Sequence, residues 1–486
     1  MKNKILWLIL GTCLAPIAYF SLFYNLSKPA IFIWDEAIYA NNAFEMASSG
    51  NFIVLQNNGE PNFYNVKPPL VIWLQSICIW VFGPNELAIR LPSAFAALLT
   101  CFMILVFSKR NLNLSIGVVA VLILLSSAGY VRPHVSRSGD LDSVLIFFIT
   151  AYSLTFFDYI LKEGHKARKT FLLISILIFG AFLSKSVAGL MPLAGLFFGS
   201  IFIKRGRALF LNKWIFIYAS ITILLCAGFY GLREWMHPGY FEIVWHSEWS
   251  RIGENIMPWH EHPFLFYAEN MKDSNYEEYL VLIPIAFVGL FSVENSKKQF
   301  ALLGVIFCIF YFLIISWPPV KLNYYDAPLY PILALLIATG LYRLYNFCLT
   351  QYDTPVWIFI LVGAIWFSIP YRSIIQKNLE YLPSDFLQYD GFAIRELSRT
   401  NPELKKYKIL FYPEHIEHID QMNFYVKALK QSKNYNLEIV QSAGQLKNFD
   451  IVLCSQPRSL DSLKARFELE EIQKLEKATL FKIKKR

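Results

Sequence analysis

Charged residues are scarce in this chain. Of its 486 residues only 17% are Asp, Glu, Lys or Arg, whereas 55% are hydrophobic, and the mean hydropathy is +0.40. A soluble globular domain carries about 25% charged residues, so this composition excludes an ordinary soluble protein. It is typical of a polytopic membrane protein with some soluble mass attached.

The sequence also lacks the patterns of several other classes. Its formal charge is +9, but the basic residues stand in short clusters between apolar runs and form no stripe of the kind that binds nucleic acid. No pair among the seven cysteines has metal-ligand spacing, so we expect neither disulfides nor a cysteine metal site. No internal repeat is evident, which disfavours the transporter folds that are built from repeats.

Apolar runs long enough to cross the hydrocarbon core of a bilayer determine the predicted topology. The first run follows Lys2 and Lys4 without a small-residue cleavage site, so we expect it to stay attached as a signal anchor. We predict about eleven spans in total. They begin near Ile5, Ala88, Leu112, Asp142, Thr170, Ser186, Lys213, Tyr279, Phe300, Tyr325 and Pro355.

The run Leu70–Phe82 is too short to be assigned by length alone, and its two tryptophans suit a helix that lies at the interface or re-enters the membrane. If it does not cross and the N-terminus is cytoplasmic, the basic loops all lie on the cytoplasmic side. We therefore predict that the C-terminus and a second set of loops lie on the outer face. These loops are 31–69, 132–142, 233–278 and 318–326.

The composition changes after Tyr371. The hydrophobic runs shorten to stretches such as YKILFY and DIVLCS, separated by polar patterns with helical periodicity such as FAIRELSR. We predict a transmembrane domain over residues 1–377 and a small α/β domain over residues 378–486. The second domain lies outside the membrane and has no catalytic motif of its own.

Two adjacent carboxylates, Asp35 and Glu36, follow the first apolar run. Such a pair at the end of a span more often caps the next helix than takes part in chemistry. Tyr64 and Lys67 favour a part in chemistry. Two prolines after Lys67 fix the backbone and present a phenol and an amine at the same interface. Alone, Lys67 would more often be a lysine that snorkels to the interface.

Other charged residues stand at the mouths of predicted spans. Asp142 either caps a helix or belongs to a site, and Arg137 either pairs with a carboxylate or headgroup or contacts substrate. Lys185 lies between two apolar runs, where its outer-face position argues against a role as an orientation marker. Lys321 and Tyr325 begin a later span, where tyrosines are commonly interface anchors.

The long outer loop carries histidines and charged residues, among them Arg251 and His260. The run HEH invites a metal interpretation, but this spacing does not place both histidines on one face of a helix. Interfacial aromatics and solvated imidazoles are the simpler explanation. His260 is the only metal candidate that we retain.

Together these residues predict an outer cleft lined with carboxylates, cations and aromatics, above a bilayer from which a lipid could enter. Cations such as Lys67 and Lys321 suit a phosphate, aromatics suit a sugar ring, and Asp35 suits the proton of an attacking hydroxyl. A transporter or flippase of lipid-linked sugars would use similar groups, but nearer the membrane midplane. A membrane scaffold whose outer domain binds a partner is a third hypothesis.

Several segments, in order along the chain, resemble one family: WDEAIYANNAFEMASSGNFIVLQNNGEPNFYNVKPPLVIWLQ, NELAIRLPSAFAALLT, RSGDLDSVLIFF, FLSKSVAGL and KLNYYDAPLYP. The resemblance is to the polyprenyl-phosphate-sugar-dependent glycosyltransferases of the GT-C class. Lipid A aminoarabinose transferases and bacterial protein O-mannosyltransferase-like proteins are the nearer relatives. It implies a polytopic α-helical fold with juxtamembrane helices on the outer face.

The resemblance also implies an activity. This is the inverting transfer of a hexosyl or pentosyl group from a polyprenyl phosphate, such as undecaprenyl phosphate, to a glycan, lipid or protein acceptor. The enzyme would lie in the bacterial inner membrane, with its active site and C-terminal domain on the periplasmic or extracellular side. Asp35 matches a base or acceptor-orienting acid, Asp142 a functionally important acid, and Tyr64 and Lys67 match donor-phosphate contacts. To the substrate-binding residues we add Arg137, Lys185, Arg251, Lys321 and Tyr325, whereas Glu36 is expected to cap or support its turn.

Two residues depart from the family pattern. Ile38 stands where the family often has an arginine, and Val66 stands where the aminoarabinose transferases have a glutamate. That glutamate is implied to hold a metal together with the histidine that His260 matches. The resemblance therefore does not carry over either a metal or lipid A as the acceptor, and a divalent metal is the one cofactor left open.

Overall fold

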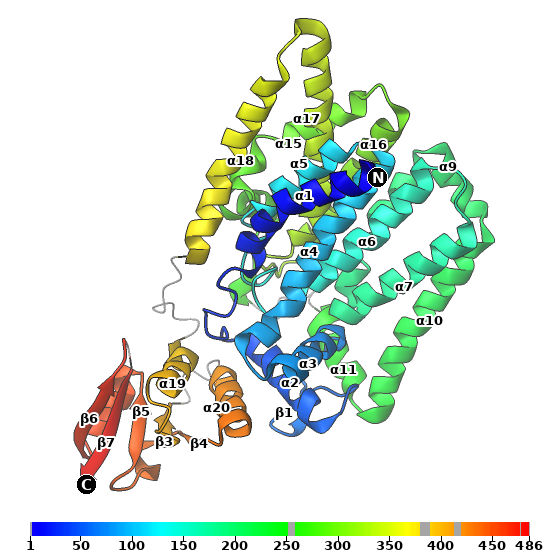
Figure 1. The fold of residues 1–486 in the computed structure, drawn as a ribbon. Helices are drawn as coiled ribbons and strands as arrows, with labels where there is room; N and C mark the ends of the chain where they lie inside the picture. Colours follow the sequence, from blue (N-terminus) through cyan, green and yellow to red (C-terminus); the bar gives the residue numbers. More distant parts are fainter. Residues whose placement is uncertain (1, 251–257, 380–388, 413–418, 477, 486) are drawn as a thin grey trace.

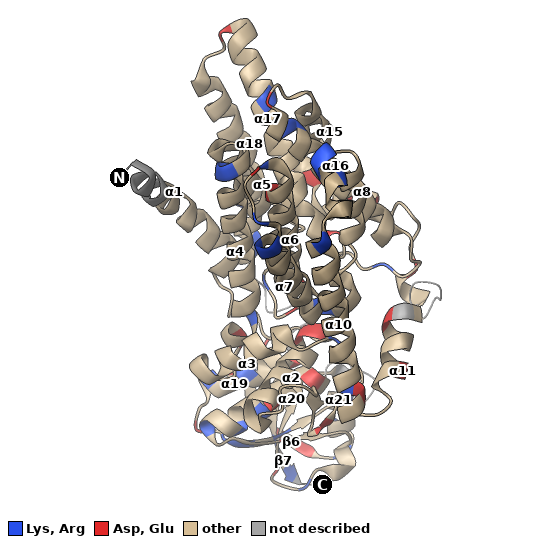
Figure 2. Cartoon of the chain, turned by 90° about the vertical axis from the view of Figure 1, so that its right-hand side faces the viewer, with Lys and Arg blue, Asp and Glu red and all other residues tan. Residues whose placement is uncertain are grey.

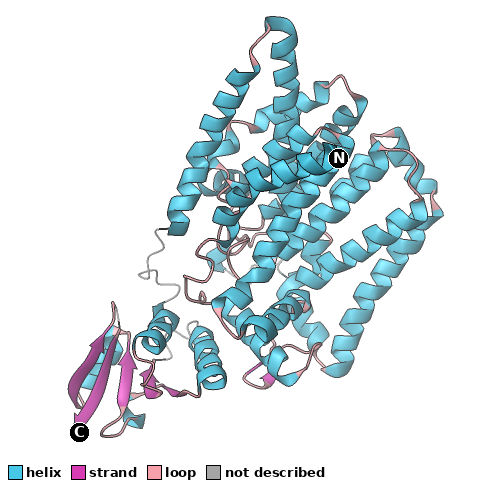
Figure 3. Ribbon diagram, viewed as in Figure 1, coloured by secondary structure: helices cyan, strands magenta, loops and turns pink. Residues whose placement is uncertain are grey.

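The computed structural model describes residues 2–250, 258–379, 389–412, 419–476 and 478–485. A long helical body contains most of the chain, and a smaller unit of strands and helices follows it (Figures 1 and 3). A helix satisfies its own backbone hydrogen bonds, which hydrocarbon requires of any segment that crosses it. The body is thus the part of the fold that suits a membrane.

Seven helices of the described chain are long and apolar enough to cross a membrane. Each begins close to a predicted span, because long apolar runs are the strongest signal that a membrane sequence carries. They are α4 (Glu86–Asn111), α6 (Asp142–Leu161), α7 (Ala167–Lys185), α10 (Lys213–Met236), α16 (Asn295–Ser316), α17 (Tyr330–Tyr352) and α18 (Val356–Leu379). The chain is a multi-pass membrane protein.

The other four predicted spans form shorter helices. Prolines explain part of this, since Pro16 lies inside one of these helices, Pro192 immediately precedes another and Pro284 lies in the first turn of a third. The total of about eleven spans therefore stays a prediction. The short helices are α1 (Lys2–Ala18) with the π-turn η1 (Tyr19–Phe23), α5 (Leu114–Leu125), α8 (Leu193–Ile201), α14 (Glu277–Leu280) and α15 (Ile283–Val288).

Two helices lie against each other at the end of the body nearer the C-terminal unit. They are α2 (Asp35–Ser49) and α3 (Leu70–Phe82), and α3 also packs on α4. Trp73 Nε1 donates to Phe52 O at 2.7 Å and Trp80 Nε1 to Ala47 O at 2.9 Å. Asp and Glu positions gather around α2 and α10 at this end, whereas several Lys and Arg positions surround α15 to α17 at the other (Figure 2).

The C-terminal unit is a five-stranded mixed sheet with helices. The strand order is β4-β3-β5-β7-β6, with β3 parallel to β4 and β5, and β7 antiparallel to β5 and β6. Hydrophobic runs predict β3, β4, β5 and β7, but β6 is an exposed, charge-rich strand at the sheet edge that carries no such run. The elements are α19 (Tyr389–Thr400), β3 (Lys406–Leu410), α20 (Ile419–Lys433), β4 (Asn436–Val440), β5 (Ile451–Cys454), α21 (Pro457–Lys464), β6 (Glu468–Lys474) and β7 (Thr479–Lys485).

The C-terminal unit is packed onto the body through α20, which contacts α2. One apolar core includes Ile31 before α2 and Ala37 in α2, and also Ile394 and Tyr425 of the C-terminal unit. Lys427 Nζ of α20 forms an ion pair with Glu45 of α2 at 2.6 Å. The segment that leads into α2 is therefore buried between the two parts of the chain.

Candidate functional site

Asp35 is the first residue of α2, and the residue before it is strained. Trp34 is the N-cap residue with φ 65° and no side-chain cap, so Asp35 does not cap the helix. A positive φ is rare for a bulky residue and costs about 1–3 kcal/mol. Asp35 gains from the positive end of the helix dipole. Its Oδ2 also accepts a hydrogen bond from the Tyr324 hydroxyl at 3.4 Å.

His134 and Asp140 lie beside Asp35, in the loop before α6. One potential ligand atom from each of the three residues lies within 4.8 Å of the others. His134 Nδ1 is 3.4 Å from Asp140 Oδ1, and the His134 ring stacks on Tyr324 with centroids 4.8 Å apart. Ser138 donates a hydrogen bond to the second Asp140 oxygen.

The electrostatics of this group favour a proton acceptor at Asp35. Burial and the nearby Asp140 carboxylate raise the pKa of Asp35, although His134 opposes them. Burial lowers the pKa of His134, but the charge and hydrogen bond of Asp140 outweigh burial and raise that pKa to about 9. The imidazolium therefore offsets carboxylate charge at neutral pH, while a raised pKa makes ionised Asp35 a stronger base.

A second pair joins the start of α6 to the end of α7. Lys185 Nζ contacts both oxygens of Asp142, at 2.7 and 2.6 Å. The same ammonium lies over the rings of Tyr324 and Tyr325, 5.1 and 5.2 Å from their centroids. Tyr324 therefore connects this pair to Asp35, because its hydroxyl donates to that carboxylate.

A third cation, Lys67, pairs with Glu248. Lys67 Nζ is 2.6 Å from Glu248 Oε1, and the second oxygen of Glu248 accepts a hydrogen bond from Ser186. Lys67, Lys185 and their carboxylate partners share a cavity of about 110 Å³ with Tyr325. The rest of the lining is mainly apolar: Leu145, Val187, Ala188, Met191, Tyr311, Ile314, Ile315, Pro318, Val320 and Pro328, together with Ser247.

A larger cavity, of about 280 Å³, lies between α4, α6 and α7 at their other ends. Arg110 and His165, which line it, both contact Asp158, at 3.0 and 3.3 Å. None of the predicted site residues lines it. We therefore place the site at the smaller cavity, where the predicted residues meet.

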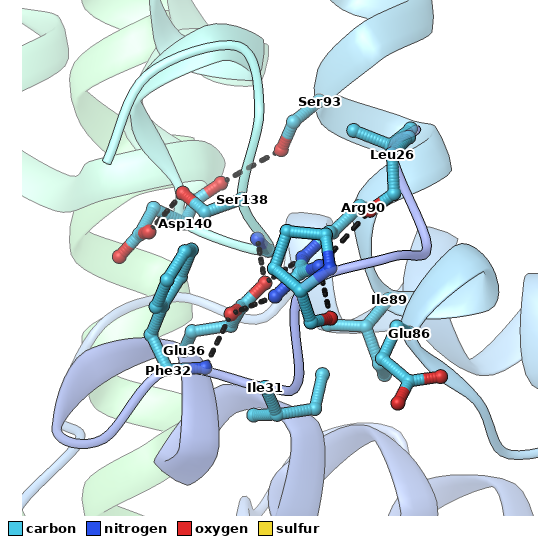
Figure 4. Close-up of polar contacts among 12 residues, drawn as sticks. Leu26, Ile31, Phe32, Glu36, Glu86, Ile89, Arg90, Ser93, Ser138 and Asp140 are labelled. Atoms are coloured by element: carbon cyan, nitrogen blue, oxygen red, sulfur yellow. Dashed lines mark hydrogen bonds and ion pairs between the residues drawn. The ribbon is translucent and has the colours of Figure 1, made fainter. Parts of the chain in front are cut away.

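Glu36 does not face this cavity, because it belongs to a buried network around Arg90 (Figure 4). The two side chains are fully buried and pair at 2.6 and 2.7 Å. Glu36 also accepts from Phe32 N and from Gly139 N, each at 2.7 Å. It supports its turn, as expected, and ties α2 to the loop that carries His134 and Asp140.

Gly139, in that loop, has no room for a side chain. A Cβ at this position would overlap the Ile89 side chain and approach Gln75 Nε2 to 3.0 Å. Overpacking of this kind typically costs about 1–3 kcal/mol. We expect Gly139→Ala to lower the thermal unfolding temperature in detergent. The matched Gly363→Ala in α18, where nothing lies within 4 Å, should not lower it, and equal losses would contradict the packing argument.

The structure brings five predicted residues together: Asp35, Lys67, Asp142, Lys185 and Tyr325. Their sequence signal was a charge or phenol at the end of an apolar run. His134, Asp140 and Tyr324 join them without having been predicted as site residues, and so does Glu248, which falls in a segment that resembles the family but was given no role. The motif HVSRSGDLDS shows two of these residues, but only the fold shows that they surround Asp35.

Two predicted substrate-binding cations contact backbone carbonyls instead. Arg137 donates to Ser21 O at 2.8 Å and Tyr24 O at 2.7 Å, which fixes the end of the first helical segment. Lys321 Nζ donates to His262 O at 2.9 Å. Neither cation lines the cavity. The sequence signals their charge but not the carbonyls that accept their hydrogen bonds.

The remaining predicted residues lie elsewhere. Tyr64 is 70% exposed, and Arg251 lies outside the described residues. His260 ends the short turn η5 (Pro258–His260), and in the described chain it belongs to no group of three close ligand atoms. Val66, where the implied metal site needs a carboxylate, is buried in an apolar cluster with Tyr240. The implied metal site therefore does not fit, and His260 is not the only candidate ligand, since Asp35, His134 and Asp140 form such a group.

Comparisons with known proteins show what the sequence and the fold are similar to. Residues 66–230 match the family model described as dolichyl-phosphate-mannose-protein mannosyltransferase. An undecaprenyl phosphate-alpha-4-amino-4-deoxy-L-arabinose arabinosyl transferase of Edwardsiella ictaluri is 27% identical, over 67% of this chain and 58% of the relative. A polyprenol-phosphate-mannose–protein mannosyltransferase of Corynebacterium glutamicum is 36% identical, over 24% of this chain and 23% of the relative. The chain spans about three fifths of the length of the curated relatives that it matches over the longest stretches.

The fold is similar to a solved structure along nearly the whole chain. ArnT from Cupriavidus metallidurans, solved with undecaprenyl phosphate bound, superposes with a TM-score of 0.68 at 15% identity and covers 98% of each chain. The oligosaccharyltransferase AglB from Archaeoglobus fulgidus superposes with a TM-score of 0.58 at 12% identity, over 87% of this chain and 64% of the other. These matches confirm the resemblance drawn from the sequence.

Proposed function

We propose that this membrane protein, which shares the fold of the GT-C glycosyltransferases, transfers a sugar from a polyprenyl phosphate to an acceptor. The observation that carries the proposal is the cavity in which Lys67 and Lys185 meet, next to Asp35. In a bacterium the donor carrier is undecaprenyl phosphate. The reaction takes place on the outer face of the plasma membrane, and the acceptor is a glycan, lipid or protein hydroxyl.

The cations are suited to the leaving group. A lipid phosphate leaves readily, so the site needs positive charge at the phosphate more than a general acid. Lys67 and Lys185, which both line the cavity, supply that charge. The apolar part of the lining, which includes Met191 and Ile314, suits the first isoprenyl units of the carrier.

Asp35 is suited to the acceptor. It takes the proton of the attacking hydroxyl while the hydroxyl oxygen bonds to the anomeric carbon. The bond from that carbon to the phosphate oxygen breaks, and the phosphate departs with the electron pair. A single displacement of this kind inverts the anomeric configuration. Tyr324, which donates to Asp35 and lies under Lys185, holds the base near the departing phosphate.

The test is release of free polyprenyl phosphate from a panel of radiolabelled polyprenyl-phosphate sugars. Purified protein receives each donor together with a membrane extract as the acceptor source. Release with transfer of label to the extract supports the proposal and identifies the donor. Absence of release, combined with movement of the intact lipid-linked sugar across vesicles, would replace it with a transporter.

Replacing Lys67 with glutamine is expected to raise KM for the donor by about 10- to 100-fold, because a hydrogen bond between charged groups contributes about 1.5–3 kcal/mol. The matched control is Lys272→Gln, since Lys272 is exposed and does not line the cavity. Initial rates over a range of donor concentrations check both variants. An unchanged KM for Lys67→Gln would exclude Lys67 from the phosphate site.

A further inference from the structure

The segment 26–34, which ends one residue before Asp35, has little regular structure of its own. Its residues form turns and an irregular stretch, and they end at the strained Trp34. Strain of this size persists only where the surroundings determine the backbone. Ile31, at the middle of the segment, is completely buried. The position of the segment therefore depends on the side chains that bind its backbone.

Helix α4 holds this segment from one side through Arg90 (Figure 4). The Arg90 guanidinium donates to Leu26 O, Pro29 O and Ala30 O, at 2.9, 2.8 and 2.8 Å. Glu86 lies four residues earlier and therefore on the same face of α4. The Glu86 carboxylate binds Tyr425 and Arg395 of the C-terminal unit, which in turn bind the segment.

The C-terminal unit holds the segment from the other side. The Tyr425 hydroxyl accepts a hydrogen bond from Ile31 N at 2.9 Å and donates to Glu86 Oε1 at 2.6 Å. Gln421, one turn earlier on α20, donates to Ile31 O. Both backbone groups of Ile31 are therefore bound by side chains of one helix.

Arg395 of α19 completes this contact. It donates to Lys28 O at 2.8 Å and forms an ion pair with Glu86 at 3.0 Å. Gln421, Tyr425 and Arg395 are all at least 94% buried. Besides contacting the Glu86 side chain, these residues bind the backbone of one short segment, so the contact fixes the course of the segment itself.

We propose that the C-terminal unit positions Asp35, with Tyr425 and Gln421 of α20 as the positioning residues. They fix Ile31, the segment transmits that position to Trp34 and the first turn of α2, and Asp35 is held at the reacting hydroxyl. This inference rests on the proposed transfer reaction. It gives the C-terminal unit a direct part in the rate.

The variant that tests the inference is Tyr425→Phe in the full-length protein, with Gln421→Leu as a second variant. Loss of the hydroxyl leaves Ile31 N and Glu86 without this partner but keeps the ring in the apolar core. We expect kcat to fall by about 10- to 100-fold, because small misplacements of a reacting group have effects of this size. KM for the donor should change little, since Lys67 and Lys185 lie on other elements.

The matched control is Tyr435→Phe. Tyr435 is also buried in the C-terminal unit, but its hydroxyl donates to Pro402 O at 3.2 Å within that unit. It therefore reports any general loss of stability of the unit. Its kcat should stay close to that of the wild type.

A second readout does not depend on activity. Hydrogen–deuterium exchange of peptides that cover residues 26–36 should be faster in Tyr425→Phe than in the wild type and unchanged in Tyr435→Phe. Unchanged exchange, or faster exchange with an unchanged kcat, would overturn the inference. If the wild type itself released no polyprenyl phosphate, the proposed reaction would fail, and exchange alone would then decide whether α20 holds the segment.

Discussion

Replacing Asp35 with asparagine should lower kcat for sugar transfer by about 100- to 10,000-fold, the usual effect of losing a positioned general base. Asparagine has almost the same shape but cannot take a proton from the acceptor hydroxyl. The environment of Asp35 supports this expectation, because burial and the Asp140 carboxylate raise its pKa. The imidazolium of His134 lies beside the two carboxylates and offsets part of their charge.

The measurement is release of polyprenyl phosphate at saturating donor, with Asp273→Asn as the matched control. Asp273 is exposed and belongs to none of the groups described above, so its variant should keep the wild-type rate. A pH profile adds a second test. Since the pKa of Asp35 is raised, the acid limb of the wild-type kcat profile should lie above about pH 3.9, the value of an ordinary aspartate. A rate for Asp35→Asn close to the wild type would exclude Asp35 as the base.

Replacing Arg90 with methionine should lower the free energy of unfolding by about 3–5 kcal/mol, because removing one partner of a buried ion pair leaves the other charge uncompensated. Glu36 is 1% exposed and would be left without its cation. The carbonyls of Leu26, Pro29 and Ala30 would lose their donor at the same time. A loss of this size is a large part of the stability of most domains.

Thermal unfolding in detergent checks this expectation, and two further variants separate its causes. The double variant Arg90→Met with Glu36→Gln removes the unpaired charge, so it should be more stable than Arg90→Met alone. Lys408→Met breaks partly exposed pairs with Asp450 and Glu438 and should cost no more than about 1 kcal/mol. A similar loss for Arg90→Met and Lys408→Met would contradict the buried-pair argument.

The sequence predicts the long helices well because hydrocarbon admits few alternatives to an apolar helix. It predicts part of the site for a related reason, since a charge such as Lys185 or Asp142 at the end of an apolar run is costly without a partner. It cannot identify that partner. Lys67 and Glu248 are 181 residues apart, and only the packing of the helices shows that they meet.

Residues whose contacts in the structure differ from the predicted ones also show that a sequence does not identify the partner of a charge. Arg137 and Lys321 look like Lys67 in the sequence, yet their partners are backbone carbonyls, which leave no trace in a sequence. Glu36 looked like a residue that only supports its turn, but it is also the buried partner of Arg90. Four of the five C-terminal strands were predictable from their hydrophobic runs, whereas β6 and the contact of Tyr425 and Gln421 with Ile31 were not.

The two lysine–carboxylate pairs of the cavity have a consequence for turnover. Because Lys67 and Lys185 are paired within the protein, a bound phosphate has to compete with Glu248 and Asp142 for them. The same carboxylates are available to recapture the lysines once the sugar has left. In the proposed reaction they compete for the lysines with the donor phosphate and with the spent carrier alike, so both are held less tightly than unpaired lysines would hold them.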